Sequence, residues 1–272
     1  RAMYFDPPAG VKIYGGFAGT ESARSQRDWD ANPTILSGDL SGNDNANISR
    51  TEATRADNSI HILKIHNKTT AVVLDGLTIT GGNADTVVLG NFDGAGAGIY
   101  MFKSVATIRN CIFEKNTANV AASLYDDGDI GRVGGSTLIL ENTIFQNNVS
   151  HRVGTFHISG GSSFQIESCV FADNQTKDSP TGYDWSGALY VSQLPTKAVG
   201  TINNTVFVNN YAKERGGAIF NQGDTQVINS TFYGNSADTD GQTIHNYDNQ
   251  TFSLKNCIIW GSSGNGNIVG NE

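Results

Sequence analysis

The chain has 272 residues and a formal net charge of −8, with 38% hydrophobic residues, 16% charged residues and 32 glycines. This acidic balance argues against nucleic acid as a partner, because phosphate neutralisation needs clustered Lys and Arg. No apolar run approaches the length of a transmembrane segment. Scarce charge argues against disorder, and abundant Gly and Asn predict a fold with many tight turns.

The first 70 residues contain short strand candidates at 11–16, 34–37 and 60–66. After the second of these, Asp39, Asn43 and Asp44 place carboxylate and amide oxygens around a glycine, as calcium-binding loops do. The segment lacks the full spacing and terminal Glu of an EF-hand, and Asp and Asn also form ordinary turns. Calcium therefore stays open as a cofactor, beside the alternative of a plain turn.

From residue 74 onward a short frame occurs seven times, each copy anchored on an aromatic or aliphatic residue. The anchors are Ile79, Phe113, Phe145, Phe171, Phe207, Phe232 and Ile259. Five positions earlier stand Leu74, Ile108, Leu140, Ile166, Ile202, Val227 and Leu254. Three positions before the anchor stand Gly76, Asn110, Asn142, Ser168, Asn204, Asn229 and Asn256. Three positions after it stand Gly82, Asn116, Asn148, Asn174, Asn210, Asn235 and Ser262.

Side chains alternate between the two faces of a strand, so an anchor and the aliphatic residue before it share the interior only if the chain bends between them. Asn and Gly tolerate the left-handed backbone of such a bend, and the following Asn predicts a second turn. Spacings of 25 to 36 residues between anchors fit one three-stranded coil with loops of variable length. We therefore predict an all-β parallel solenoid of about nine or ten coils. It forms a single domain over 1–272, with residues 1–70 less regular than 71–262.

Two positions before the anchor the column holds Leu77, Cys111, Thr143, Cys169, Thr205, Ser230 and Cys257. This column faces the interior, where a free Cys behaves as a small hydrophobic residue. Three cysteines without metal-ligand spacing do not predict a disulfide framework. We expect three buried, unpaired thiols.

A second element, Gly96-Ala-Gly-Ile99, recurs as Ser186-Gly-Ala-Leu189 and Gly216-Gly-Ala-Ile219. Together with the Phe-x-x-Asn element it resembles the repeats of the chlamydial polymorphic outer-membrane proteins. The stretches 13–19, 35–40 and 75–83 are similar to secreted bacterial right-handed β-helix proteins. The resemblance implies a right-handed parallel β-helix, a pectate-lyase-like solenoid, exported to the outside or outer surface of a bacterium as part of a larger protein. Because these motifs are structural, it implies no catalytic residue.

Insertions at 84–95, 118–134 and 176–186 all follow the Asn turn, so stacking predicts that they share one edge of the solenoid. Exposed aromatic rings beside carboxylates are typical of a sugar-binding surface. We expect a shallow groove that binds polysaccharide or a cell surface, lined by Tyr125, Tyr183, Trp185, Asp126, Asp127 and Asp184. Solenoids also tolerate polar insertions without function.

Two other classes of function stay open. A polysaccharide lyase would need a base and cationic groups, for which the candidates are Arg132, Arg152, Lys213 and Arg215. A glycoside hydrolase would need two carboxylates, from among Asp126, Asp127, Asp129 and Asp184. The third class is a structural stalk. Separately, the outward column Thr78, Ile112, Ile144, Val170, Val206, Thr231 and Ile258 could form a contact face for a partner or a repetitive ligand.

Overall fold

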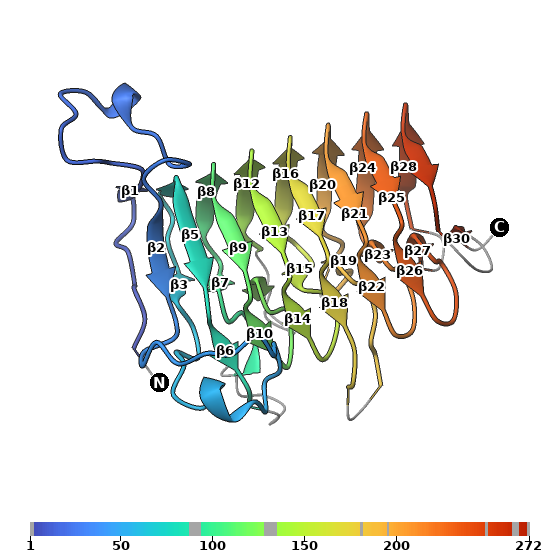
Figure 1. The fold of residues 1–272 in the computed structure, drawn as a ribbon. Helices are drawn as coiled ribbons and strands as arrows, with labels where there is room; N and C mark the ends of the chain where they lie inside the picture. Colours follow the sequence, from blue (N-terminus) through green and yellow to red (C-terminus); the bar gives the residue numbers. More distant parts are fainter. Residues whose placement is uncertain are drawn as a thin grey trace.

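The computed structural model describes residues 3–86, 94–127, 135–179, 182–194, 196–247, 250–262 and 267–270. The chain winds into a right-handed parallel β-helix, and its coils stack side by side from the N-terminus to the C-terminus (Figure 1). Every strand pair is parallel, and four sheets run along the solenoid. In the order in which one coil visits them we name them sheets I, II, III and IV.

Sheet I consists of β1 (Lys12–Tyr14), β4 (Val72–Asp75), β8 (Val105–Arg109), β12 (Thr137–Glu141), β16 (Ser163–Glu167), β20 (Val199–Asn203), β24 (Asp224–Ile228) and β28 (Phe252–Lys255). Sheet II consists of β2 (Thr34–Ser37), β5 (Leu77–Thr80), β9 (Ile112–Glu114), β13 (Ile144–Gln146), β17 (Val170–Ala172), β21 (Val206–Val208), β25 (Thr231–Tyr233) and β29 (Ile258–Trp260). Sheet III consists of β6 (Asn83–Ala84), β10 (Thr117–Ala118), β14 (Val149–Ser150), β18 (Gln175–Thr176), β22 (Tyr211–Ala212) and β26 (Ser236–Ala237). Sheet IV consists of β3 (Leu63–His66), β7 (Ile99–Phe102), β11 (Leu124–Asp127), β15 (Phe156–Ile158), β19 (Leu189–Val191), β23 (Ile219–Asn221), β27 (Ile244–Asn246) and β30 (Ile268–Gly270).

The described residues form eight coils, because sheets I, II and IV each have eight strands. This corrects the expected nine or ten. Two insertions use up the first 70 residues: 15–33, with the short 3-10 helix η1 (Arg24–Gln26), and 38–62, with η2 (Ala53–Arg55). The remaining residues of this segment are enough for only one coil, formed by β1, β2 and β3. Six of the eight coils also contain a fourth, two-residue strand in sheet III that the three-stranded prediction lacked.

The predicted bend between sheets I and II is confirmed. Each residue of the Asn/Gly column from Gly76 to Asn256 has a positive φ, between 50° and 78°. At the second turn the left-handed residue lies one position earlier than expected, at Gly81, Lys115, Asn147, Asp173, Asn209, Gly234 and Gly261. The Asn after it has another role.

Five buried asparagines, Asn116, Asn148, Asn174, Asn210 and Asn235, form a ladder inside this second turn. Each of the first four donates its Nδ2 to the Oδ1 of the next, over 2.9–3.1 Å. The same Oδ1 accepts the preceding asparagine's backbone N–H, and Nδ2 also reaches a carbonyl such as that of Ile79. Buried amides are costly unless they are paired, so this ladder fixes the register of the coils.

The aromatic anchors stack in the interior as predicted. Phe113, Phe145, Phe171, Phe207 and Phe232 are fully buried, and successive ring centroids lie 4.8 Å apart. That distance equals the spacing between strands. The stack is therefore imposed by the parallel register.

The three cysteines are unpaired, as expected. Burial raises the pKa of Cys111 to about 11 and that of Cys169 to about 12, so both are inert thiols. Cys257 is only half-buried, which corrects the expectation for that residue. It lies in the last coil, where β28 and β29 have a neighbouring strand on one side only among the described residues.

Candidate functional site

The predicted groove at the loop edge is only partly present. Residues 85–86 and 177–179 follow β6 and β18 of sheet III, so these two insertions leave from one edge. Residues 124–127, however, are strand β11 of sheet IV and not part of a loop. Asp129 and Arg132, and residues 87–93 of the first insertion, lie outside the described residues.

Tyr125 belongs to a ladder of stacked rings on the outward face of sheet IV. The register aligns Tyr100, Tyr125, His157, Tyr190, Phe220 and His245 on successive strands. Their neighbouring centroids lie 4.7–6.0 Å apart. All but the half-buried Tyr125 are buried, although they point away from the core of the solenoid. These rings are therefore packing residues.

Asp126 and Asp127 do not face a groove. Asp126 points inward, is fully buried, and accepts hydrogen bonds of 2.6 Å from the hydroxyls of Ser136 and Ser162. Burial raises its pKa to about 6 despite these bonds. Asp127 accepts the Tyr100 hydroxyl at 2.7 Å. The expectation that Asp126 lines a binding surface is wrong, because strand alternation turns it inward.

Tyr183, Asp184 and Trp185 do lie together beside sheet IV. The Trp185 ring stacks on Phe220 at 4.7 Å, and its Nε1 donates to Glu214 at 2.9 Å. Tyr183 meets Trp185 edge-on at 4.9 Å and is 44% exposed. Trp185 is thus an extension of the ring ladder, and its removal would affect folding.

The charged candidates at this edge are structural or dispersed. Asp184 is 3% exposed and accepts the Ser179 N–H at 3.0 Å; burial raises its pKa to about 6. The Arg152 guanidinium covers the Tyr183 ring at 5.0 Å. Arg215 approaches Asp240 at 3.6 Å, and Lys213 is exposed. The contacts of Arg152 with Tyr183 and of Arg215 with Asp240 each join two coils, and neither brings two carboxylates together.

The calcium candidates have protein partners. The Asp39 carboxylate accepts the backbone N–H groups of Gly42, Asn43 and Asp44 at 2.8–3.2 Å, as an Asp in a turn does. Asp44 lies 3.3 Å from the Arg55 guanidinium. The part of the chain that the structure describes contains no group of three or more His, Cys, Asp or Glu side chains arranged to hold a metal ion.

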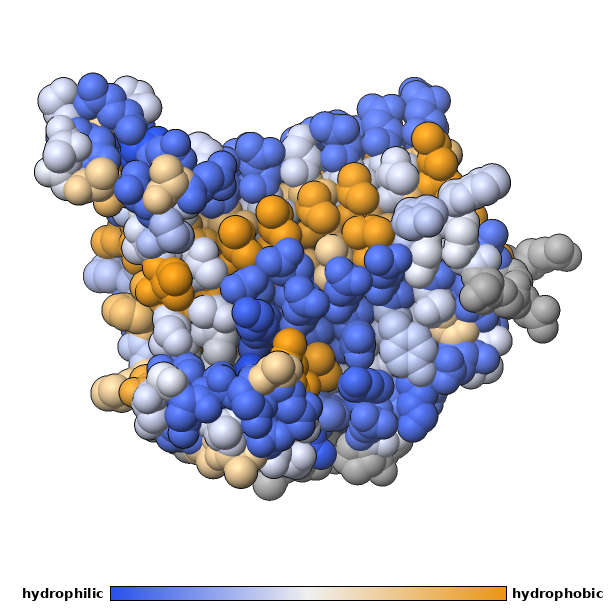
Figure 2. All heavy atoms as spheres, in the orientation of Figure 1, coloured by the Kyte–Doolittle hydropathy of each residue, from blue (hydrophilic) through white to orange (hydrophobic). Residues whose placement is uncertain are grey.

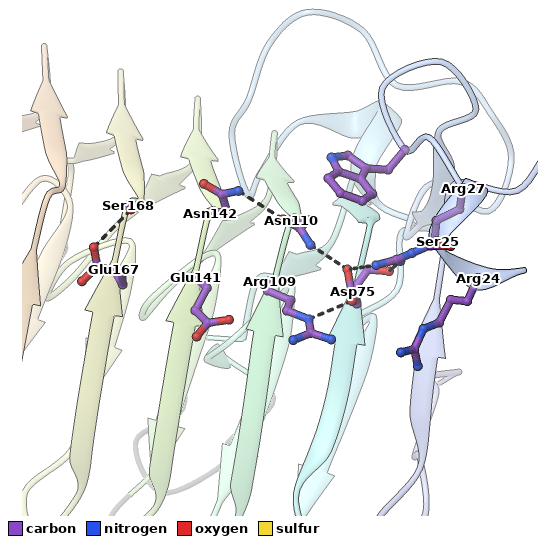
Figure 3. Close-up of a pocket in the computed structure, with 11 residues that line it drawn as sticks. Arg24, Ser25, Arg27, Asp75, Arg109, Asn110, Glu141, Asn142, Glu167 and Ser168 are labelled. Atoms are coloured by element: carbon purple, nitrogen blue, oxygen red, sulfur yellow. Dashed lines mark hydrogen bonds and ion pairs between the residues drawn. The ribbon is translucent and has the colours of Figure 1, made fainter.

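A pocket of about 890 Å³ lies at the opposite edge, where sheet I bends into sheet II (Figure 3). One wall comes from the 15–33 insertion, which arches over the first coils. The floor and the far wall come from the last residues of β4, β8, β12 and β16 and from the bends that follow. The lining residues are Arg24, Ser25, Arg27, Trp29, Asp75, Arg109, Asn110, Glu141, Asn142, Glu167 and Ser168.

Asp75 is the buried centre of this pocket. Arg27 contacts its carboxylate at 2.6 Å from the insertion, Arg109 at 2.8 Å from β8, and Asn110 donates to it at 2.8 Å. Burial favours the neutral acid, but the hydrogen bonds from Arg27, Asn110 and Arg109 outweigh it and lower the Asp75 pKa. The same contact raises the pKa of Arg109. Asp75 is therefore a fixed anion that positions two guanidinium groups.

The close approach of the insertion explains why Gly76 replaces Asn at this bend. A Cβ on Gly76 would lie 3.2 Å from Arg27, Trp29 and Gly15, and one on Gly15 would lie 2.1 Å from the Gly76 carbonyl oxygen. Gly15 therefore allows the close approach of the backbone at Gly76, and a side chain at Gly76 would crowd the Arg27 guanidinium that contacts Asp75.

The far wall offers hydrogen-bonding groups at neighbouring positions. Glu141 pairs in register with Glu167 on the next strand. Asn203 and Ser168 hold Glu167 over 2.8 and 3.2 Å, whereas Glu141 and Asn142 are exposed. Guanidinium, carboxylate and amide groups in one open pocket can bind the hydroxyl and charged groups of a sugar.

The predicted site residues do not line this pocket. A sequence signal for it exists in the column four positions before each anchor, which reads Asp75, Arg109, Glu141, Glu167, Asn203, Ile228 and Lys255. Charge concentrated in one outward column of a weakly charged chain indicates a functional strip. The contribution of Arg24, Arg27 and Trp29 could not be read from the sequence, because they come from an insertion outside the repeat.

The parallel coils and the residue columns agree with a comparison to known families. Residues 40–232, and again 97–272, match the family described as the right handed beta helix region. The chain belongs to this right-handed β-helix family. No curated protein and no solved structure shows significant similarity to this β-helix. Among its described residues, no helix has the length and apolar character needed to cross a membrane.

Proposed function

We propose that this chain is a non-catalytic β-helix module, located outside a bacterial cell, that binds polysaccharide through the pocket between sheets I and II. The observation that carries the proposal is the pocket itself, an open space of about 890 Å³ lined by three arginines, three carboxylates, two amides and a tryptophan. Opposite charges are balanced within it. A ligand rich in hydroxyl groups matches such a lining better than an apolar one.

The protonation states of the central residues favour binding over elimination chemistry. A lyase base must be able to lose its proton, and Asp75 stabilises the charged form of Arg109 instead. The lowered pKa of Asp75 equally disqualifies it as a general acid. Both groups suit a preorganised binding site.

A glycoside hydrolase is the second candidate, favoured by one observation. Glu141 and Glu167 stand at paired positions on adjacent strands, and retaining hydrolases use two carboxylates roughly 5 Å apart. Bonds from Asn203 and Ser168 already occupy the Glu167 carboxylate. Binding is therefore the better-supported function.

A glycan array followed by calorimetry with the best soluble oligosaccharide tests the proposal. Arg24→Ala and Glu141→Ala remove exposed groups from opposite walls, and each should weaken binding by about tenfold, since a charge-assisted hydrogen bond contributes about 1.5–3 kcal/mol. Gln165→Ala is the matched control, because Gln165 is an exposed residue of β16 outside the pocket.

Unchanged affinity in both pocket variants would refute this site. Release of new reducing ends from the bound oligosaccharide, abolished by Glu141→Gln, would replace the binding module with the hydrolase.

A further inference from the structure

The outward face of sheet II carries uncovered apolar side chains in register along the solenoid. Figure 2 shows a row of hydrophobic residues running along the molecule over this sheet. We use "the sheet II face" for the outward side chains of β13, β17, β21, β25 and β29. They are Ile144, Gln146, Val170, Ala172, Val206, Val208, Thr231, Tyr233, Ile258 and Trp260.

Register places these side chains in two straight rows. One row aligns Ile144, Val170, Val206, Thr231 and Ile258, and the other aligns Gln146, Ala172, Val208, Tyr233 and Trp260. All but one residue of the first row are β-branched isoleucine or valine, and the exception is β-branched threonine. Such side chains have few rotamers, so the surface is rigid and loses little entropy when it is covered.

The face becomes more exposed toward the last described coil. Tyr233 is 50% exposed, Ile258 62% and Trp260 71%, and Tyr233 and Trp260 are register partners on adjacent strands. Ile258 and Trp260 lie on β29, which has a neighbouring strand on one side only among the described residues, whereas Tyr233 lies on β25 between two strands and is still half exposed. Exposed large apolar groups gathered in one place indicate a contact surface.

No side chain of the sheet II face is charged at neutral pH, although the chain carries a net charge of −8. An anionic polymer would find no cation here. A second copy would bring another eight negative charges. An uncharged ligand matches the face best.

A row of amides borders the face at the bend from sheet I. Asn142, Asn204, Asn229 and Asn256 are exposed there. They are held in line by hydrogen bonds along the row, such as Asn256 to Asn229 at 3.3 Å and Asn204 to Ser168 at 3.0 Å. Flat apolar groups beside a line of amides complement a pyranose chain, whose rings expose C–H groups on their faces and hydroxyl groups at their edges.

We propose that the sheet II face is a second binding surface, which takes the flat side of an uncharged polysaccharide laid along the solenoid. Tyr233 and Trp260 stack on sugar rings, the aliphatic rows contact the C–H groups, and the amide row binds hydroxyl groups. The inference shares the class of ligand with the pocket, and the two sites meet at Asn142; the side chains of the sheet II face do not line the pocket.

Co-sedimentation of the 272-residue protein with insoluble cellulose and with chitin tests this surface. The wild type should bind at least one of the two. The double variant Tyr233→Ala/Trp260→Ala should bind about tenfold or more weakly, in the range of a central aromatic anchor. Ile144→Lys, which places a charge in the aliphatic row, should also weaken binding without changing the melting temperature by more than a few degrees.

The matched control is Tyr183→Ala, which removes an exposed aromatic ring that lies beside sheet IV, outside the sheet II face. Arg24→Ala separates the two proposals, because it should impair the pocket and leave sedimentation unchanged. Three results would overturn the inference: no wild-type binding to either polymer, binding unaffected by the double variant, or self-association in sedimentation velocity that Ile144→Lys abolishes.

Discussion

Sheets II and IV are built alike, from eight parallel strands in register, yet their outward rows differ in exposure. On sheet IV the row is aromatic and mostly buried, with Trp185 of one connection from sheet III stacked on Tyr190 and Phe220; on sheet II it is mainly aliphatic and bare. The solenoid core constrains only the inward side chains. A covered outward row therefore becomes a second core that stabilises the fold, whereas a bare one is available for contact.

The strongest test of this comparison is Phe220→Ala on sheet IV. Phe220 points outward but is fully buried, with Trp185 and His245 stacked at 4.7 Å on its ring. We expect a loss of about 3–5 kcal/mol in the free energy of unfolding, equal to that of the interior Phe171→Ala. Urea denaturation of both variants measures it. A loss below about 1 kcal/mol for Phe220→Ala alone would show that the covered row is not a core.

The pH dependence of the stability of His157→Phe tests the same comparison in a second way. Burial lowers the pKa of His157 to about 4, so the folded state favours the neutral ring. The resulting stability is present above the unfolded pKa of about 6.5 and is lost as the pH falls through 4, a difference of about 3 kcal/mol. Phenylalanine keeps the stack without titrating.

Melting curves of wild type and His157→Phe near pH 7 and near pH 4 measure this effect. The variant should gain stability relative to wild type on acidification. An equal acid response of the two proteins would place His157 in contact with solvent.

Asp126→Asn tests a pH dependence of stability that is opposite in sign to that of His157. The folded pKa of Asp126 is raised to about 6, so its burial costs no stability below the unfolded pKa of about 3.9 and costs roughly 2–3 kcal/mol once the pH rises through 6. The neutral amide removes this penalty while keeping contact with Ser136 and Ser162. The stability of Asp126→Asn relative to wild type should therefore increase from pH 4 to pH 7. A stability difference that does not change with pH would contradict the raised pKa of Asp126.

The smallest effect belongs to sheet II. Val170→Ala trims a half-buried side chain of the bare row, and we expect a change within about 1 kcal/mol in the free energy of unfolding. The same denaturation experiment as for Phe220→Ala applies. A loss of 2 kcal/mol or more would mean that another part of the chain covers this row.

The repeat columns predicted much of the fold because backbone conformation and inward packing are local properties. The bend at Asn110, the buried Phe113 and the turn before Asn116 can each be read from one copy of the frame. Sheet IV was harder to place, because the link from the Asn turn to its strand varies from Asn148–Phe156 to Asn174–Leu189. The recurring triplet of a small, an aliphatic and an aromatic residue, as in Gly98-Ile99-Tyr100, is the signal that locates it.

The pocket depends on long-range contacts that no repeat specifies. The ion pair between Arg27 and Asp75 joins residues 48 positions apart, one of them in an insertion without internal symmetry. The inward direction of Asp126 was missed for a related reason. Its polarity indicated a loop, whereas its distance from Leu124 within β11 sets it on the same face as that core residue.

Because of the asparagine ladder, a whole coil can be added to the solenoid or removed from it as a unit. Asn210 and Asn235 occupy equivalent positions 25 residues apart, and the Oδ1 of each accepts the Nδ2 of the preceding asparagine in the same way. Joining Asn210 directly to Ser236 would put Ala237, Ile244, Leu254 and Ile259 where Ala212, Ile219, Val227 and Phe232 now lie. A gene encoding this chain can therefore lengthen or shorten by whole coils, through duplication or deletion, without a new core having to evolve.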